Sequence, residues 1–162
     1  MTIKTSYAVT VNDVMTRDPV SVEPSMSARE LARVLTDNNI SGVPVVDVQD
    51  RVVGVVSRTD LLQWCVTGGL GFGADDLLPS LSAKRHVRRV AADDLGIVED
   101  FMSSDPILAT ANEAVDSVAR RMAAEKVHRI IVVDADGCLA GIVTSLDLLK
   151  VFPRQAHGCC GC

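Results

Sequence analysis

Aromatic side chains are scarce in this 162-residue chain, which contains one Trp, one Tyr and three Phe. Recognition of bases by stacking on several rings is therefore mostly unavailable, and a ligand pocket has to be lined mainly by aliphatic side chains. Hydrophobic residues make up 48% and charged residues 23% of the chain. This balance is ordinary for a globular protein and argues against wholesale disorder.

Long apolar runs are also missing. No stretch reaches the roughly 18 apolar residues that a membrane helix needs, and the start, MTIKTSYAV, has no apolar segment of a secretory signal. The formal net charge of -5 repels nucleic acids and anionic membranes. One basic run, KRHVRR at 84–89, is followed closely by acidic residues and favours a solvated surface. We therefore expect a cytoplasmic, soluble protein without a membrane or nucleic-acid partner.

The five cysteines are an odd number and do not form a disulfide framework. Cys65 and Cys138 stand in apolar surroundings, where a thiol behaves as a small hydrophobic group. The remaining three gather with a histidine in a set that could bind a soft metal, namely His157, Cys159, Cys160 and Cys162. Their spacing lacks the two separated pairs of a closed zinc site, so a frayed terminus is the alternative.

The dominant feature of the chain is an internal duplication. Residues 40–62, ISGVPVVDVQDRVVGVVSRTDLL, align without a gap with residues 127–149, VHRIIVVDADGCLAGIVTSLDLL. The match extends upstream, where VNDVMTRDPV at 11–20 aligns with VEDFMSSDPI at 98–107. Each copy of such a repeat is one structural unit whose apolar face is covered by its neighbour. We therefore expect one core shared between two halves.

The duplication divides the chain into five parts. These are a lead-in at 1–10, repeat 1 at 11–64, a partly mobile inter-repeat segment at 65–97, repeat 2 at 98–152 and a Cys-rich tail at 153–162.

Hydrophobic spacing predicts the same elements in both repeats. After a helical turn, each repeat has a short strand, a helix, a β-hairpin and a closing helix. The predicted ranges in repeat 1 are strand 20–22, helix 27–38, strands 43–46 and 51–56, and helix 57–64. Those in repeat 2 are strand 107–110, helix 112–126, strands 130–133 and 138–143, and helix 144–152. The fold class is therefore α+β, built from two β-α-β-β-α units.

Each repeat places a hydroxyl three residues before an acid at the start of its closing helix, as Ser57 with Asp60 and Thr144 with Asp147. A helix capping box explains this spacing without any ligand. The alternative is a binding site, because free amide groups at a helix start suit phosphate. A carboxylate beside them can accept hydrogen bonds from the two hydroxyls of a ribose. Both interpretations can hold together.

A second polar signal is the pair His128 and Arg129, at the start of the second hairpin, where the first repeat has no basic residue. The guanidinium fork matches phosphate, and a neighbouring imidazole can add a donor. Alternatively, both are surface charges that pair with Glu125 or Asp134. The residues alone leave this choice open.

These motifs together resemble a tandem pair of cystathionine beta-synthase (CBS) domains, called a Bateman module, over residues 11–149 apart from the middle segment. The resemblance is carried by VMTRDPVSV and FMSSDPILA, by GVPVVD and RIIVVD, and by GVVSRTDLL and GIVTSLDLL. The HRIIVVD segment also resembles the nucleotide-binding repeats in the gamma subunit of AMP-activated protein kinase. The resemblance implies two pseudo-symmetric repeats packed sheet to sheet, with a cleft on either side.

The resemblance also implies a ligand, which would be AMP, ADP, ATP or a related adenosyl compound such as S-adenosylmethionine. Asp60 and Asp147 correspond to the carboxylates that hold ribose, with Ser57 and Thr144 as their hydroxyl partners. The remaining implied contacts are Ile40 and Val55 with Ile107 in the first cleft, Val127 and Ile142 with Val20 in the second, and His128 and Arg129 at the phosphates.

The leading hypothesis is therefore a regulatory module that senses an adenosyl ligand and signals to an effector protein. An enzyme is not expected, because no combination of nucleophile, base and orienting group is recognisable, and no resident cofactor is expected. One alternative is a structural module that dimerises without binding a ligand, since members of this family commonly form homodimers. Another is a metal-linked or redox regulator that acts through the terminal cysteines.

Overall fold

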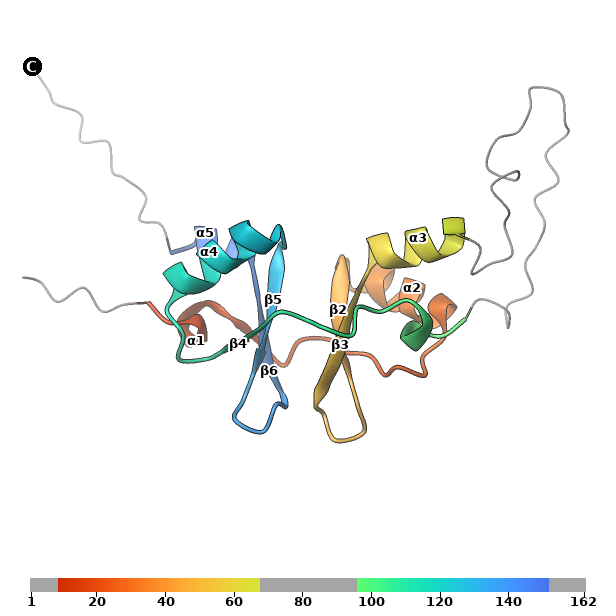
Figure 1. The fold of residues 1–162 in the computed structure, drawn as a ribbon, viewed down its shortest axis with the longest axis horizontal. Helices are drawn as coiled ribbons and strands as arrows, with labels where there is room; N and C mark the ends of the chain where they lie inside the picture. The colour runs from red at the N-terminus through yellow and green to blue at the C-terminus, as the bar shows by residue number, and fades with distance from the viewer. Residues whose placement is uncertain (1–8, 68–95, 152–162) are drawn as a thin grey trace, which may run out of the picture. The chain divides into compact units, whose positions relative to one another are not determined.

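The computed structural model describes residues 9–67 and 96–151, which form two compact units (Figure 1). Unit 1 consists of Met1–Asp18 and Ile107–Cys162, and unit 2 consists of Pro19–Pro106. The two repeats have therefore exchanged their leading segments. Residues 11–18 pack with the second repeat, and residues 98–106 pack with the first.

Unit 1 contains a four-stranded sheet in the order β1-β6-β5-β4. Its parallel pair is β4 with β5, and the other neighbours are antiparallel. The strands are β1 (Thr16–Arg17), β4 (Leu108–Thr110), β5 (Arg129–Val133) and β6 (Leu139–Thr144). The helices are α1 (Val11–Val14), α4 (Val115–Glu125) and α5 (Ser145–Leu149), of which α4 and α5 contact each other beside the β5–β6 hairpin (Figure 1).

Unit 2 repeats this plan with a smaller sheet. The hairpin pairs β2 (Gly42–Val46) with β3 (Val52–Ser57). A parallel bridge from Val22 to Val45 and an antiparallel bridge from Ser103 to Val55 occupy the places that β4 and β1 take in unit 1. The helices are α2 (Ala28–Asp37), α3 (Arg58–Thr67) and the 3-10 turn η2 (Val98–Asp100).

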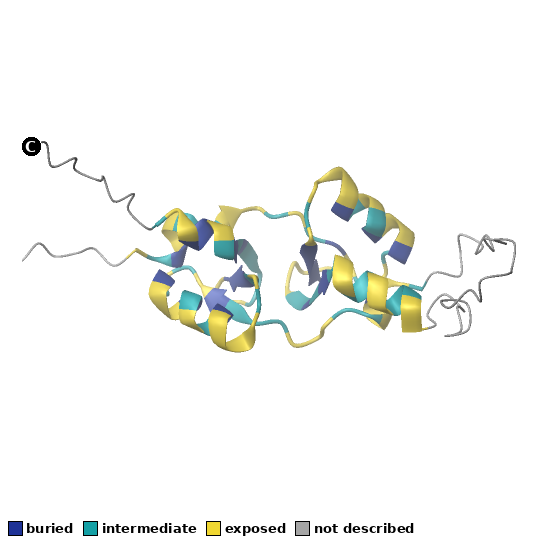
Figure 2. Ribbon diagram, turned by 90° about the horizontal axis from the view of Figure 1, so that it is seen from above, coloured by how far each residue is buried: buried dark blue, intermediate teal, exposed yellow. Residues whose placement is uncertain are grey.

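Each unit has its own hydrophobic core, in place of the single shared core expected from the sequence, and the leading segments anchor both cores. Val11 is fully buried among the core residues of unit 1, and its counterpart Val98 is fully buried in unit 2. The helical spacing of Ala28, Leu31, Ala32 and Leu35 puts them on one face of α2, where three of them are buried and Ala32 is half-buried. Figure 2 shows that buried positions on the helices alternate with exposed ones, as expected for amphipathic surface helices.

The α+β class and both hairpins are confirmed, but some predicted element bounds are wrong. No strand forms at 20–22, where Val20 is 41% exposed and Val22 alone makes a bridge. The second long helix begins at Val115 instead of residue 112, because Thr110 and Glu113 form a turn in which the Thr110 amide donates to Glu113 Oε1 at 2.8 Å. The closing helix of repeat 2 ends at Leu149, not at residue 152.

Candidate functional site

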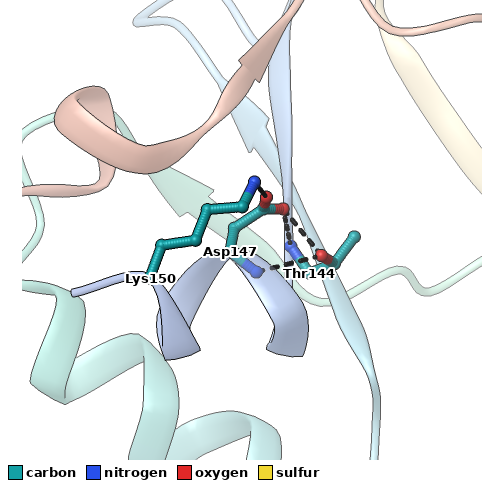
Figure 3. Close-up of polar contacts among 3 residues, drawn as sticks. All are labelled: Thr144, Asp147 and Lys150. Carbon is teal, nitrogen blue, oxygen red and sulfur yellow. Dashed lines mark hydrogen bonds and ion pairs between the residues drawn. The ribbon is translucent and has the colours of Figure 1, made fainter. Parts of the chain in front are cut away.

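The predicted acid of repeat 2 closes a hydrogen-bonded ring where β6 passes into α5 (Figure 3). Oδ2 of Asp147 accepts from the Thr144 amide at 2.9 Å and from the Thr144 hydroxyl at 2.6 Å. The amide of Asp147 donates back to Thr144 Oγ1 at 3.3 Å. This reciprocal pattern is the capping box predicted from the sequence.

The second oxygen of Asp147 is held by a residue that the sequence reasoning missed. Lys150 donates from Nζ to Oδ1 of Asp147 at 2.6 Å, with the carboxylate side chain 8% exposed and the lysine side chain 72% exposed. Burial acts to raise the pKa of Asp147, but the hydrogen bonds from Lys150 and Thr144 outweigh it, so the pKa lies below its ordinary value. The signal was available, since residues three apart on a helix can pair.

The predicted acid of repeat 1 makes the same ring at the start of α3. Oδ2 of Asp60 accepts from the Ser57 amide at 2.8 Å and from its hydroxyl at 2.7 Å, and the Asp60 amide donates back at 3.3 Å. Asp60 is partly exposed. The residue in the place of Lys150 is Gln63, which is exposed. Among the described residues, the Asp60 carboxylate accepts hydrogen bonds only through Oδ2.

The two basic residues of repeat 2 lie at the same end of the hairpin as its capping box. Arg129 begins β5 directly across from Thr144, which ends β6. The carbonyl of His128 accepts from the amide of Ser145 at 3.0 Å, which ties the loop to the start of α5. Unit 1 thus brings together His128, Arg129, Thr144 and Asp147 through the register of one hairpin.

The predicted aliphatic contacts are distributed over both units. In unit 2, Ile40 packs against the core and Val55 lies in β3 between Pro44 and Ser103. In unit 1, Val127 and Ile107 pack against the core, and Ile142 lies in β6. Ile107 and Val20 belong to different units from the acids that they were expected to complement, so their roles stay predictions.

A separate groove of about 570 Å³ opens in unit 2, and none of the predicted ligand residues lines it. Its polar lining is mainly acidic, and includes Glu23, Glu30, Asp47 and Asp50.

No metal-binding group of three or more His, Cys, Asp or Glu residues occurs in the described part of the chain. The candidate metal ligands His157, Cys159, Cys160 and Cys162, like the basic run at 84–89, lie outside it. None of the helices within 9–67 and 96–151 is both long and apolar enough to span a bilayer.

Comparison with known proteins gives matches over both repeats. The profile of the CBS domain matches residues 11–67 and 98–154. The chain is 30% identical over 152 residues to the CBS domain-containing protein CBSX1, chloroplastic, of Arabidopsis thaliana, covering 90% of this chain and 64% of that protein. It is 25% identical to L-aspartate semialdehyde sulfurtransferase of Methanocaldococcus jannaschii, over 88% of this chain and 23% of that enzyme. The chain thus spans less than two thirds of the length of these relatives.

Solved structures of similar chains include complexes with adenosyl compounds. The CBS domain pair of protein MJ0100, in complex with 5′-methylthioadenosine and S-adenosyl-L-methionine, has a TM-score of 0.68 at 25% identity, covering 90% of this chain and 96% of that one. CBSX2 of Arabidopsis thaliana, in complex with AMP, has a TM-score of 0.67 at 29% identity, covering 87% and 93%.

Proposed function

Because this chain belongs to the CBS domain family and carries two copies of the domain, we propose that it is a regulatory module that binds an adenine nucleotide or a related adenosyl ligand. The observation that carries the proposal is the repeated geometry at the end of each hairpin. A hydroxyl and a carboxylate are held there in the same hydrogen-bonded ring, in repeat 1 and in repeat 2. Further support comes from similar chains solved with AMP and with S-adenosyl-L-methionine.

In this proposal the acids Asp60 and Asp147 bind the ribose. An ionised carboxylate only accepts hydrogen bonds, and the 2′ and 3′ hydroxyls of a ribose donate two of them side by side. The capping ring fixes the rotamer of each acid before a ligand arrives, which lowers the entropy lost on binding. Within each capping box the carboxylate accepts its hydrogen bonds through Oδ2, so we expect the ribose hydroxyls to donate mainly to Oδ1.

The other predicted contacts divide by chemistry. Ile40 and Val55 in repeat 1, and Val127 and Ile142 in repeat 2, are the aliphatic residues proposed to contact adenine, completed by Ile107 and Val20. His128 and Arg129 are proposed to hold phosphate. Arg129 is half-buried at the start of β5 and His128 is exposed beside it, so both are already placed near Thr144 by the strand register.

The ligand signals by favouring one conformation of the module over another, since binding shifts an equilibrium only by its preference between states. The protein that receives this signal is proposed to be an effector protein, and no catalytic role is proposed for this chain.

We also propose a homodimer, supported by two exposed leucines at equivalent places on the closing helices. Leu62 on α3 is 65% exposed and Leu149 on α5 is 61% exposed.

The proposal is tested by calorimetry and thermal unfolding with AMP, ADP, ATP and S-adenosylmethionine. At a free ligand concentration 100 times the Kd, binding to the folded state alone stabilises it by about 2.7 kcal/mol, which gives a clear rise in Tm. At least one of the four compounds is expected to release or absorb heat and raise Tm. If none of them does either, the proposal is wrong.

A second candidate is an interaction module without a ligand. It is favoured by the finding that both hydroxyl–acid pairs already serve as helix caps, a sufficient structural reason for their presence. Under this alternative, Asp60→Ala and Asp147→Ala leave self-association and partner binding unchanged once the loss of stability is corrected for. Dependence of partner binding on an adenosyl compound would exclude it.

A further inference from the structure

The two ribose acids differ in how much of their hydrogen-bonding capacity is already used. A carboxylate offers about four lone-pair positions, two on each oxygen. On Asp147, two on Oδ2 are taken by the amide and hydroxyl of Thr144, and one on Oδ1 is taken by Lys150 (Figure 3). On Asp60, only the two on Oδ2 are taken by described residues.

This difference bears directly on the binding of a vicinal diol, which needs two acceptor positions. The outer oxygen of Asp60 provides both. The outer oxygen of Asp147 provides one while Lys150 is in place, so a ribose that uses both hydroxyls has to displace the ammonium. Because the Lys150 side chain is 72% exposed, its ammonium can move into solvent without rearrangement of the core. The cost is the ion pair itself, made with a carboxylate side chain that is 8% exposed.

We propose that Lys150 is a specificity-determining residue that competes with ribose hydroxyls for Asp147. Repeat 2 then binds a neutral riboside more weakly than repeat 1, so the two sites fill in order, with Asp60 first. Lys150 acts through Asp147, because it occupies an acceptor position on Oδ1 that the ribose would use. The inference rests on the proposed adenosyl-binding function and adds an unequal affinity to it.

The test isolates each site with a substitution that keeps the side-chain shape. In an Asp60→Asn background, which leaves Asp147 as the charged acceptor, Lys150→Gln installs the residue that repeat 1 has at that place. Adenosine, a neutral diol, is the calorimetric probe. Its affinity is expected to rise about two- to fivefold, the range for release of a partly exposed ion pair. Lys150→Arg, which keeps the cation, is expected to retain the affinity of the background.

A reciprocal variant and a second probe separate competition from a general structural effect. In an Asp147→Asn background, Gln63→Lys is expected to weaken adenosine binding by a similar factor. With 2′-deoxyadenosine, which lacks one of the two hydroxyls, the gain from Lys150→Gln is expected to be smaller than with adenosine. A change in stability alone would move both probes equally.

Unchanged or weaker adenosine binding in the Lys150→Gln variant overturns the competition, and so does an equal gain for both probes. AMP could bind the natural chain while adenosine binds neither the Asp60→Asn variant nor Asp60→Asn combined with Lys150→Gln. In that case competition between Lys150 and ribose is also overturned, while the proposed function stands. If AMP and the other adenosyl compounds fail to bind the natural chain, the proposed function itself fails.

Discussion

A Cβ atom on Gly54 would lie 2.9 Å from Sδ of Met102, so strand β3 runs against this methionine with no room for a side chain. The carbonyl oxygen of Ser103 would be equally close, at 2.9 Å. Gly141 in β6 has the same relationship to Met15 and Thr16, with the same two distances of 2.9 Å. The leading segments that the two repeats exchange therefore dock on glycines of the hairpin strands.

Alanine at Gly54 or Gly141 is expected to destabilise the fold by about 1–3 kcal/mol, the usual cost of overpacking a tight contact. The free energy of unfolding in urea measures this directly. Adding Met102→Ala to Gly54→Ala is expected to give little relief, because the Ser103 carbonyl belongs to the backbone and stays in place. A Gly54→Ala variant as stable as the natural chain would show that the strand is not packed this closely.

A second prediction concerns the hairpin turns. Asp50 has a φ of 60° and its counterpart in repeat 2, Gly137, has a φ of 81°. Only glycine adopts this left-handed region without steric cost. Asp50→Gly is therefore expected to stabilise the protein by up to about 0.5–1 kcal/mol, and Gly137→Asp to destabilise it by a similar amount. Thermal unfolding of the two variants is compared with that of the natural chain. A lower Tm for Asp50→Gly than for the natural chain would contradict backbone strain at Asp50.

The pH dependence of stability is expected to depend on Asp147. Its pKa is lowered in the folded state, although burial alone would raise it, because Lys150 and Thr144 donate to it. Its contribution is therefore complete above the ordinary carboxyl pKa of about 3.9. It is lost as the pH falls below that value through the lowered folded-state pKa. Lys150→Gln removes the cation and brings the folded-state pKa closer to the ordinary value, so the loss of stability is expected to be smaller than in the natural chain and to be complete at a higher pH.

Carboxyl chemical shifts followed by NMR from pH 7 to pH 2 measure this titration. The Asp147 signal in the natural chain is expected to titrate below the ordinary value, and in Lys150→Gln closer to it. Titration of Asp147 above the ordinary value in the natural chain would mean that burial outweighs its hydrogen bonds.

The proposed homodimer leads to a fourth prediction. Leu62→Asp or Leu149→Asp places a charge on an exposed closing-helix position and is expected to shift the protein to monomers in sedimentation velocity. Val48→Asp is the control, because Val48 is 92% exposed in the turn of the first hairpin. If the natural chain sediments as a monomer, or if the control dissociates equally, the closing helices are not the contact.

Local features were predictable from the sequence because local interactions determine them. Ser27 and Glu30 have the three-residue spacing of a capping box, and this box forms at the start of α2, with the Ser27 hydroxyl donating to Glu30 Oε2 at 2.7 Å. Both hairpins form in the predicted places. At the starts of the two closing helices, the predicted capping boxes are confirmed. Ligand binding by the same residues stays a prediction that the experiments test.

The packing partners of the leading segments, and the importance of the Lys150–Asp147 pair, were not predictable from local sequence. The leading segments at 11–18 and 98–106 have matching sequences, so no local signal says which repeat each one packs against. The pairing of Lys150 with Asp147 has a visible spacing, but three-residue spacings are common on helices and most make exposed pairs of little energy. What makes this pair distinctive is the burial of Asp147, which depends on the complete unit.

The central claim is that Asp60 and Asp147 bind the ribose of an adenosyl ligand, and calorimetry with AMP tests it most directly. The natural chain is compared with Asp60→Asn, Asp147→Asn and the double variant, each shown to be folded by circular dichroism. Each single variant is expected to lose one of the sites, and the double variant to bind AMP at least about tenfold more weakly, since each charged hydrogen bond contributes about 1.5–3 kcal/mol. A folded double variant that binds AMP as tightly as the natural chain would contradict the claim.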